Sequence, residues 1–523
     1  MVNKNIFKTQ KPVVTTRNNA GGHAYSMTAE NALCQLAVTN CFNGTYYSSA
    51  NDLLNKTKEL VGQCKPETIA KIAVYARESG KMKDMPVFLL AYLYANGENN
   101  LADKIFARVI YNGKMLSNFM RIIRSGELGR KSFGSHLKNT IKQWISLRSN
   151  IQLFKDSIGI SNPSMMDMFK MVHPKPENAE VNNFYRYLLG KECSNSALPS
   201  EVYEFEKFKK NPVGSPPAVD FRLLSNIKMS ESQWRELSLT MSWDTLRRNL
   251  NTLYRNGVFN HAGVSTQLAA KLRDEKSIRG SNVFPYDIMT TYIATEGNIP
   301  RNVRDALHDA LEISTQNIPA INGRVAICVD VSGSMSSPIT GARYGATTSA
   351  TCVQAASVIA CSILRKNPDS IILPFDTSVH KTNLETRDSV MTNADKLRKY
   401  GGGGTCCELP IAELVRKHEK VDLVIMISDN ESWAQMNPKY RGYGYHGMSG
   451  KTGMHAEWNK LKSINPKAKL VCIDLTPNTT VQVEDAQSVM NIGGMSDTIF
   501  TAISRFYENG DLDFSKVISE VKL

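Results

Sequence analysis

The stretch at residues 324–337, RVAICVDVSGSMSS, places a carboxylate and two hydroxyls directly after a short apolar run. Asp330 is followed by Ser332 and Ser334; later in the chain, Thr405 follows four glycines and Asp429 ends another apolar run. Two carboxylates and three hydroxyls are hard oxygen donors, which suit Mg²⁺, Mn²⁺ or Ca²⁺ better than Zn²⁺. The alternative is an Asp/Ser turn that caps the next helix. We expect a divalent metal site, with Mg²⁺ as the cofactor and Mn²⁺ or Ca²⁺ as alternatives.

Both aspartates must lie on one edge of a sheet if they are to share an ion. Four short β-branched runs occur after residue 320, namely residues 324–330, 370–375, 421–428 and 468–474. A helical segment at residues 347–367 separates the first two. Strands that are buried on both faces and alternate with helices predict a doubly wound, mainly parallel sheet. Ligands in such sheets bind beyond the carboxyl ends of the strands, and two of the four expected strands end in aspartate, at Asp330 and Asp429.

The chain before residue 320 has a different pattern, in which apolar residues recur with helical spacing. In residues 65–79, for example, Ile69, Ile72 and Ala76 fall on one face of a helix. Similar segments follow at residues 85–96, 101–112, 114–125, 135–147, 230–240 and 242–256. Helical pairs stacked side by side are typical of a solenoid, here without a strict repeat period. We therefore predict a helical-repeat domain at residues 1–320 and an α/β domain at residues 321–523.

The net charge of +14 is distributed unevenly. Residues 321–523 hold 22 of the 63 Lys and Arg and 21 of the 49 Asp and Glu, a net charge of +1. Residues 1–320 hold the other 41 basic and 28 acidic residues, a net charge of +13. A basic domain joined to a neutral one favours a polyanionic partner for the first domain only, whereas solubility alone is the alternative explanation.

Several basic side chains of the first domain are candidates for contacts with a phosphate backbone. Residues 126–149 predict a helix with its apolar residues facing inward, and Lys138 and Lys142 flank that face at i and i+4. Arg130 and Lys131 lie in the preceding turn. Such side chains follow phosphates without identifying bases, although an ordinary solvated helix face is the alternative. Two further pairs of arginines are candidates, Arg121 with Arg124 and Arg247 with Arg248. The sequence does not say which member of each pair faces RNA.

No motif of an enzyme is present, so we assign no catalytic residue. The chain has no G-x-S-x-G nucleophile elbow, and none of its ten cysteines forms a C-x-x-C pair. A metal-dependent nuclease usually needs more carboxylates than Asp330 and Asp429, often around two ions. No run approaches the roughly 18 apolar residues of a membrane span, and residues 1–19 lack the apolar stretch of a secretion signal. We expect a cytoplasmic, non-enzymatic protein with reduced thiols and no membrane partner.

The order of the oxygen donors resembles the metal-ion-dependent adhesion site of von Willebrand factor A domains, with Asp330-Val-Ser332-Gly-Ser334 followed by Thr405 and Asp429. The chain also resembles the Ro autoantigen family, whose members join a TROVE domain of helical repeats to such a domain. The segments that carry this resemblance are RNNAGGHAYSM (17–27), NGTYYSSANDL (43–53), Gly129-Arg130 with LKNTIKQW (137–144), VHPKP (172–176), LTMSWDTLRRNL (239–250) and SDNES (428–432). They cover nearly the whole chain in the family's order, and they are similar to a bacterial or phage-type Ro protein.

The resemblance implies a monomeric ring of HEAT-like repeats that the von Willebrand factor A domain closes. It implies binding of small non-coding Y RNAs on the outer surface, at a segment that here contains His173 and Lys175. It also implies capture of single-stranded 3′ ends of misfolded RNAs in the central hole, for RNA quality control or processing. A 3′ exoribonuclease such as polynucleotide phosphorylase, tethered through RNA, is a partner that the resemblance suggests for bacterial members.

The metal site itself leaves a second function open. Because Ser332, Ser334 and Thr405 add no charge, we expect the ion to attract one more anionic ligand, such as a carboxylate of a partner protein. In that alternative the chain is a metal-dependent protein-interaction module, and its basic domain is incidental.

Overall fold

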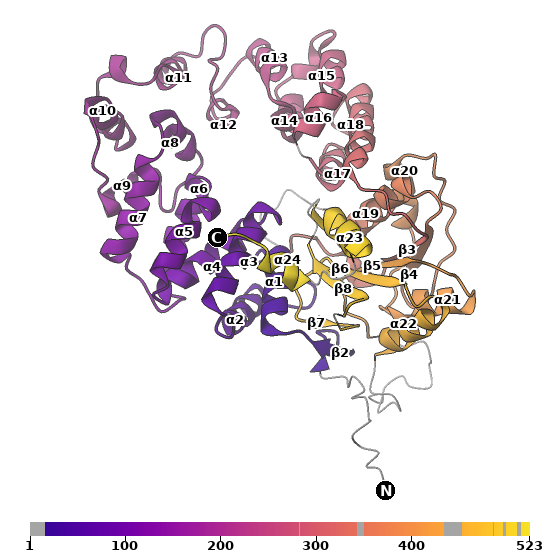
Figure 1. Cartoon of the computed structure of the whole chain (residues 1–523). Helices are drawn as coiled ribbons and strands as arrows, with labels where there is room; N and C mark the ends of the chain where they lie inside the picture. The colour runs from indigo at the N-terminus through magenta and orange to yellow at the C-terminus, as the bar shows by residue number, and fades with distance from the viewer. Residues whose placement is uncertain are drawn as a thin grey trace. The chain divides into compact units, whose positions relative to one another are not determined.

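The computed structural model describes residues 16–281, 283–341, 350–433, 452–484, 486–494, 498–509 and 514–523 (Figure 1). The chain forms two compact units. The helical unit takes in Lys65–Val283, Thr291–Ile313 and Val521–Leu523, and the α/β unit takes in Phe284–Thr290, Ser314–Glu520 and the described part of Met1–Cys64. Within the described residues, no helix is long and apolar enough to cross a bilayer.

The helical unit consists of successive short helices joined by turns, as the apolar periodicity predicts. Its helices are α3 (Pro66–Glu78), α4 (Asp84–Ala95), α5 (Asn99–Val109), α6 (Gly113–Ser125), α7 (Gly134–Ser146), α8 (Asn150–Asp156), α9 (Met165–Val172), α10 (Ala179–Leu188), α11 (Ser200–Lys210), α12 (Phe221–Leu224), α13 (Glu231–Thr240), α14 (Trp243–Arg255), α15 (Val264–Leu272), α16 (Glu275–Gly280) and α18 (Arg301–Ser314). Helix α17 (Pro285–Ala294) begins in the α/β unit and ends in the helical unit. Neighbours along the chain pack together, as α3 does with α4 and α13 with α14.

Helix α6 shows how local sequence sets these elements. The Asn112 side chain accepts a hydrogen bond from Met115 N at 3.0 Å and so caps the first turn. Gly126 ends the helix with φ +82°, a left-handed conformation that glycine adopts without steric cost. Phe119 and Ile123 face inward and are fully buried. The polar residues between them are therefore left on the outer surface of the unit.

The α/β unit is built on a five-stranded sheet in the order β4-β3-β5-β6-β8, and every neighbouring pair is parallel. Its strands are β3 (Val325–Asp330), β4 (Ile371–Phe375), β5 (Leu423–Ser428), β6 (Lys469–Asp474) and β8 (Val489–Gly493). The four strands expected from the sequence are confirmed, and β8 is an additional one. Because the strands are parallel, their carboxyl ends share one edge, with Asp330 in register with Phe375 and Ser428 with Asp474.

Helices cover both faces of this sheet, which makes it doubly wound. They are α19 (Cys352–Lys366), α20 (Val390–Leu397), α21 (Glu408–Arg416), α22 (Gly453–Ile464), α23 (Thr498–Asn509) and α24 (Phe514–Ser519). Cys328 and Met426 pack against Leu414 of α21 and Trp458 of α22. Helix α19 contacts β3 and β5, and Figure 1 shows it on the other side of the sheet from α22. The expected fold class is therefore confirmed in both parts of the chain.

The compact units do not follow the expected boundary at residue 320, because the N-terminal segment packs with the α/β unit. This segment contains β1 (Thr16–Arg17), β2 (His23–Ser26), α1 (Ala29–Thr39) and α2 (Ala50–Val61). Strand β2 pairs antiparallel with β7 (Thr480–Val481), which places Tyr25 opposite Val481. Helix α1 contacts β8 and α24. Pairing between strands so far apart in the sequence leaves no local pattern, so the sequence did not predict it.

Candidate functional site

The five expected metal ligands meet at the carboxyl edge of the sheet. Asp330 ends β3, Ser332 and Ser334 lie in the turn that follows, and Asp429 comes directly after β5. Ser332 Oγ lies 3.3 Å from Ser334 Oγ, and Thr405 Oγ1 donates a hydrogen bond to Ser332 Oγ at 2.9 Å. All five side chains are more than nine-tenths buried. The structure thus brings together the donors that were expected from spacing and residue type.

The glycine run before Thr405 permits a close approach between two loops. A Cβ atom at Gly401, whose φ is +92°, would lie 1.8 Å from the carbonyl oxygen of Val331. The backbone of the run hydrogen-bonds to the turn after β3, with Gly402 N donating to Val331 O and Gly333 N donating to Gly403 O. No other residue type fits at Gly401, so this loop is built to hold Thr405 against Ser332.

The electrostatics of this cluster favour a cation. Burial, together with the nearby Asp429 carboxylate, raises the pKa of Asp330 to about 7, and burial also raises the pKa of Asp429. No ion pair between the described residues involves either carboxylate. Two buried carboxyl groups that share hydroxyl neighbours and lack a basic partner are stabilised by a bound divalent ion. The donor set therefore fits Mg²⁺, with Mn²⁺ or Ca²⁺ as hard-ion alternatives.

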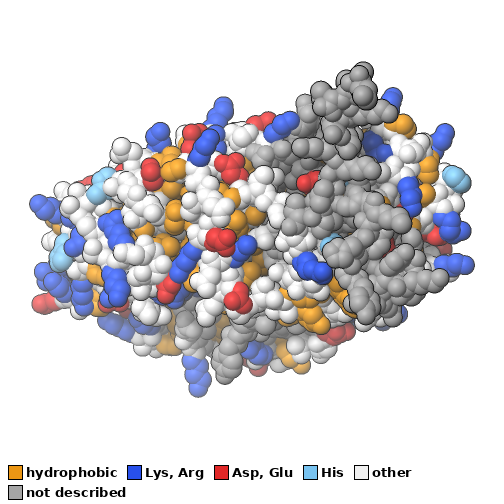
Figure 2. Space-filling view, turned by 90° about the horizontal axis from the view of Figure 1, so that it is seen from below, with side chains coloured by type: hydrophobic (Ala, Val, Ile, Leu, Met, Phe, Trp, Pro, Cys, Tyr) orange, Lys and Arg blue, Asp and Glu red, His pale blue; other side chains and the backbone are white. Residues whose placement is uncertain are grey.

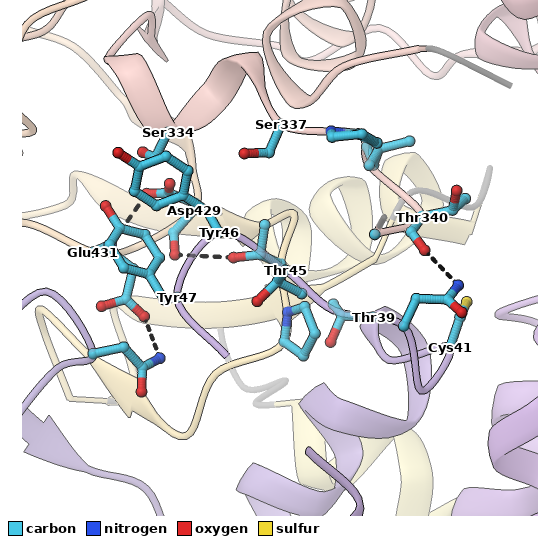
Figure 3. A pocket seen from close by; sticks show the side chains of 17 residues that line it. Thr39, Cys41, Thr45, Tyr46, Tyr47, Ser334, Ser337, Thr340, Asp429 and Glu431 are labelled. Carbon is cyan, nitrogen blue, oxygen red and sulfur yellow. Dashed lines mark hydrogen bonds between the residues drawn. The ribbon is translucent and has the colours of Figure 1, made fainter. Parts of the chain in front are cut away.

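A third carboxyl group, Glu431, also lies at this edge, although it was not among the expected ligands. Its side chain is 1% exposed, and burial raises its pKa to about 7. Asn19 Nδ2 donates to Glu431 Oε1 at 2.6 Å and Ala20 N donates to Oε2 at 3.1 Å. Figure 3 shows Glu431 beside Asp429 and Tyr47. The segments RNNAGGH and NGTYYSS therefore lie beside the cluster of oxygen donors, and only their resemblance to a family singled them out in the sequence.

Two more aspartates follow strands of this sheet, Asp376 after β4 and Asp474 at the end of β6. Asp376 accepts hydrogen bonds from Ser378 N at 3.0 Å and lies 3.0 Å from His380 Nε2; although burial opposes ionisation, these contacts lower the pKa of Asp376. Burial raises the pKa of Asp474 well above its usual range. The sequence pattern pointed to Asp330 and Asp429 at this edge, and these two aspartates were passed over. The charges of Glu431 and Asp429 also raise the pKa of Asp474, whereas Asp376 hydrogen-bonds with Ser378 and lies beside His380.

Catalysis by clustered acids finds no support in this arrangement. The described residues contain no group of three or more His, Cys, Asp or Glu side chains placed to hold a metal ion. Three of the five donors around the expected ion are hydroxyls. Such a set binds an ion without gathering the several carboxylates that two-metal phosphodiester cleavage uses.

Most basic candidates of the helical unit lie on or beside three packed helices, whereas Arg247 and Arg248 lie on α14. Arg121 and Arg124 are exposed on α6, Lys138 and Lys142 are partly exposed on α7, and α9 packs against both helices. Beyond the end of α9, His173 adopts a left-handed conformation, with φ +55°, and is exposed, as is Lys175. Figure 2 shows many Lys and Arg side chains at the left of the view, the side on which Figure 1 places α7 and α9. We call Arg121, Arg124, Lys131, Lys138, Lys142, His173 and Lys175 the α6–α7–α9 basic surface.

Most of these side chains have no strong acidic partner. Arg121 Nη2 donates to Asn118 Oδ1 at 3.0 Å, and Arg124 Nη1 lies 3.7 Å from Met171 Sδ. Among the described residues, no ion pair involves Lys131, Lys138 or Lys142. Their positive charges therefore remain available to a polyanion.

Two candidates instead support the fold. The Arg130 guanidinium donates to the carbonyl oxygens of Tyr94, Ser132 and Phe133 at 2.8, 2.7 and 2.5 Å. Arg247 is 3% exposed and donates to Thr291 Oγ1 and Asp244 Oδ1 at 2.6 and 2.7 Å. The expectation of an RNA contact from Arg247 is corrected, because its side chain is buried, whereas the contact expected from the partly exposed Arg130 stays a prediction.

Arg248 shows the opposite placement within the same helix. Its side chain is 62% exposed and its Nε lies 2.9 Å from Asp244 Oδ2. The structure thus answers the question left open by the sequence, since Arg247 faces a neighbouring helix and Arg248 faces solvent.

Comparison with known proteins agrees with the fold, and one match covers the segment that holds the five oxygen donors. A family model described as the Ro60 vWA domain matches residues 324–442, which contain all five metal donors. The RNA-binding protein RO60 of Deinococcus radiodurans is 24% identical over 459 residues, 81% of this chain and 84% of that protein. The chain is similar to proteins of the Ro family, and its match to the Deinococcus protein extends well beyond residues 324–442.

Two further matches point the same way. The RNA-binding protein RO60 of Caenorhabditis elegans is 22% identical over 216 residues, 39% of this chain and 32% of that protein. The crystal structure of the Deinococcus radiodurans RO (RSR) protein matches with a TM-score of 0.62 at 18% identity, covering 92% of this chain and all of that one. The structural match supports the fold of this chain.

Proposed function

We propose that this protein binds RNA and takes part in quality control or processing of non-coding RNA. The observation that carries the proposal is the α6–α7–α9 basic surface, whose lysines make no ion pair among the described residues. Relatives that are named RNA-binding proteins supply the second line of support. We propose small non-coding Y RNAs as the ligands of this surface, because unpaired lysines on adjacent helices suit a folded phosphate backbone.

A gel-shift titration with a labelled structured RNA tests the basic surface. The variant Lys138→Glu/Lys142→Glu removes two phosphate contacts, and at about 0.15 M salt we expect roughly 20-fold weaker binding, since each contact contributes about 0.7 to 0.9 to the log–log salt slope. The matched control is Lys420→Glu/Lys467→Glu, which makes the same change of net charge at two exposed lysines of the α/β unit. If both variants lost the same affinity for RNA, the effect would come from the net charge of the protein and not from this surface, which would contradict the proposal.

We further propose that single-stranded 3′ ends of misfolded RNAs are captured in a central hole, as the family resemblance implies. A competition experiment separates this activity from binding at the basic surface. An RNA with an accessible single-stranded 3′ end should compete for the protein better than the same RNA with that end annealed to a complementary strand. A 3′ exoribonuclease such as polynucleotide phosphorylase is the proposed partner, and its co-purification should be lost after RNase treatment, because the RNA forms the tether.

We propose that Asp330, Ser332, Ser334, Thr405 and Asp429 hold a divalent cation, most naturally Mg²⁺. The support is their burial in one cluster and the raised pKa of Asp330 in the absence of a basic partner. The ion would neutralise two buried carboxylates and hold the turn after β3 against the glycine loop. Chelation with EDTA followed by a thermal melt tests the site, since removal of a ligand that binds the folded state lowers the melting temperature.

We propose that the protein is not an enzyme. The hydroxyl-rich donor set supports this view, because cleavage of phosphodiesters usually uses more carboxylates around the ion. Labelled RNA incubated with the protein and Mg²⁺ should therefore stay intact over hours. Fragments that form with Mg²⁺ and are absent with EDTA would instead establish a metal-dependent nuclease.

A further inference from the structure

A pair of adjacent tyrosines reaches the metal cluster from the N-terminal segment. Tyr46 and Tyr47 lie between α1 and α2, with ring centroids 4.8 Å apart. The Tyr47 hydroxyl hydrogen-bonds with Ser334, and burial together with the nearby Asp429 and Glu431 carboxylates raises its pKa to about 12. Tyr46 is 66% exposed. Figure 3 shows Tyr47 among Ser334, Asp429 and Glu431, three residues of the α/β fold.

The loop that carries Tyr47 is anchored at both ends. Asn43 Nδ2 donates to Thr340 O at 2.7 Å, which joins the loop to the segment after the Ser334 turn. Thr45 N donates to Ser48 O at 2.8 Å and closes a tight turn around the two tyrosines. The capping box of Ser49 and Asp52 then starts α2. The position of Tyr47 is therefore fixed by the backbone on either side of it.

The space beside Tyr47 is small. A cavity of about 20 Å³ is lined by Tyr46, Tyr47, Ser334, Asp429, Glu431 and neighbouring residues. A single water molecule needs roughly 10–15 Å³ by the same measure. The cavity is lined by two of the five donors, Ser334 and Asp429, and has room for about one water; a carboxylate side chain from another protein does not fit in it beside Tyr47.

The charges at this edge also disfavour an anionic ligand from outside. The carboxyl groups of Asp330 and Asp429 balance the charge of a divalent cation, and Glu431 adds a third carboxyl group close to Asp429. A further carboxylate would meet repulsion from Glu431 in a buried setting, where charge interactions are strong. A neutral oxygen ligand avoids that cost.

We propose that the Tyr47 hydroxyl is the ligand that completes the metal centre, so that the chain closes the site with its own N-terminal segment. The inference rests on the proposed metal site and names its last ligand. It replaces the partner carboxylate that the sequence alone suggested. A partner protein would bind this ion only after displacing Tyr47.

Binding of Mn²⁺, measured by electron paramagnetic resonance of the free ion, tests the proposal in the full-length chain. We expect Tyr47→Phe to weaken Mn²⁺ binding about 10-fold, within the range seen when a supporting metal-site contact is lost. Tyr46→Phe is the matched control, because it removes an adjacent hydroxyl from an exposed ring, and it should change the affinity less than about twofold. Equal affinities for Tyr47→Phe and the wild type would overturn the proposal.

Acetate distinguishes a site that is closed by Tyr47 from one that awaits a carboxylate. In the wild type, we expect acetate to leave the Mn²⁺ affinity unchanged, because Tyr47 fills the position. In Tyr47→Ala the ring is absent, and acetate should restore at least part of the lost affinity. Acetate that tightens Mn²⁺ binding equally in the wild type and in Tyr47→Ala would show that the position is open and would overturn the proposal.

The failure of the inference differs from the failure of the metal site. If the wild type binds no Mn²⁺, or if Asp330→Asn binds it as well as the wild type does, the metal site and its Tyr47 ligand both fall. If Asp330→Asn loses Mn²⁺ while Tyr47→Phe keeps full affinity, the metal site stands and the Tyr47 ligand alone falls. Thermal melts of each variant in EDTA show whether the fold is retained.

Discussion

The proposed metal centre and the α6–α7–α9 basic surface place their polar groups in opposite ways. At the proposed metal centre, Asp330 and Thr405 are 0% and 1% exposed, and Thr405 Oγ1 and Ser428 Oγ donate hydrogen bonds to Ser332 Oγ and Asp330 Oδ2. On the basic surface, Lys138 and Lys142 are partly exposed on one helix, and no ion pair among the described residues restrains them. Leaving a charge unmatched in a buried site is costly, so the protein must hold all the ligating side chains of such a site in place. Exposed lysines are flexible, so they can adjust to the position of the ligand.

This contrast teaches that a motif and a charge excess give different kinds of information. A metal site needs several side chains that point at one ion, so the proposed site can be read from the sequence as individual residues. The basic excess identifies a domain, since phosphate contact depends on the summed charge and less on any one lysine. Single substitutions should therefore have large effects at the metal centre and small ones on the basic surface.

The largest expected effect is at Asp330. Asp330→Asn removes a charged ligand from the ion, and we expect Mn²⁺ affinity to fall by about 100-fold or more, the top of the range for supporting contacts. The measurement is Mn²⁺ titration followed by electron paramagnetic resonance. Asp376→Asn is the control, because Asp376 is also buried after a strand of the same sheet yet contacts Ser378 and His380. A comparable loss in both variants would mean that the edge as a whole, and not the five donors, holds the ion.

The next largest effect is on stability, where a buried and an exposed arginine of the helical unit are compared. Arg247→Met removes a buried cation that hydrogen-bonds to Thr291 and Asp244. We expect the free energy of unfolding to fall by roughly 2–3 kcal/mol. This loss is smaller than that for a fully buried ion pair, because Asp244 is 39% exposed. Arg248→Met in the adjacent position should cost less than about 0.5 kcal/mol, because exposed pairs contribute little. Urea titration followed by circular dichroism measures both.

If Arg247→Met and Arg248→Met were equally stable, the assignment of one arginine to the fold and the other to the surface would be wrong. The contrast between buried and exposed charged groups would then apply only between the two units. If the expected difference is found, the same contrast applies to two consecutive residues of one helix.

The sequence predicted the four strands β3, β4, β5 and β6 because each is a short apolar run buried on both faces. Strand β8 was missed, since VMNIG contains Asn491 and Gly493, which weaken the pattern of a buried strand. The helical segments were predicted from periodicity, which depends only on neighbours three and four positions apart. Contacts such as Tyr25 with Val481 have no such local cause, so the attachment of residues 16–64 to the α/β unit was not predicted.

The same limit applies to the candidate site. Asp330, Ser332 and Ser334 lie within five positions of one another, and Thr405 and Asp429 follow structural features that the sequence shows, a glycine run and a strand end. Tyr47 and Glu431 come together only through the fold, and neither has a spacing that marks it. Arg130 and Arg247 could not be separated from true surface cations, because their partners are backbone carbonyls and side chains on other helices.

A smaller effect is expected in the salt dependence of RNA binding. The logarithm of affinity should fall linearly with the logarithm of salt concentration, by about 0.7 to 0.9 for each phosphate contact. Lys138→Glu/Lys142→Glu should make this slope shallower by about 1.4 to 1.8, whereas Asp330→Asn should leave it unchanged. Fluorescence anisotropy at four or more salt concentrations gives the slopes. A flat dependence for the wild type would exclude phosphate contact as the main source of affinity.

The smallest expected effect is that of metal removal on RNA binding. The proposed ion lies among five buried donors of the α/β unit, and the basic surface belongs to α6, α7 and the end of α9 in the helical unit. We expect EDTA to change the affinity for a structured RNA by less than about twofold at constant ionic strength, since a neutralised, buried charge acts only over short distances through screened solvent. Anisotropy titrations with Mg²⁺, with EDTA, and with Asp330→Asn in both buffers measure this. If EDTA weakened RNA binding more than 10-fold in the wild type and had no effect in Asp330→Asn, the two regions would be energetically coupled, and the ion would then be part of RNA recognition.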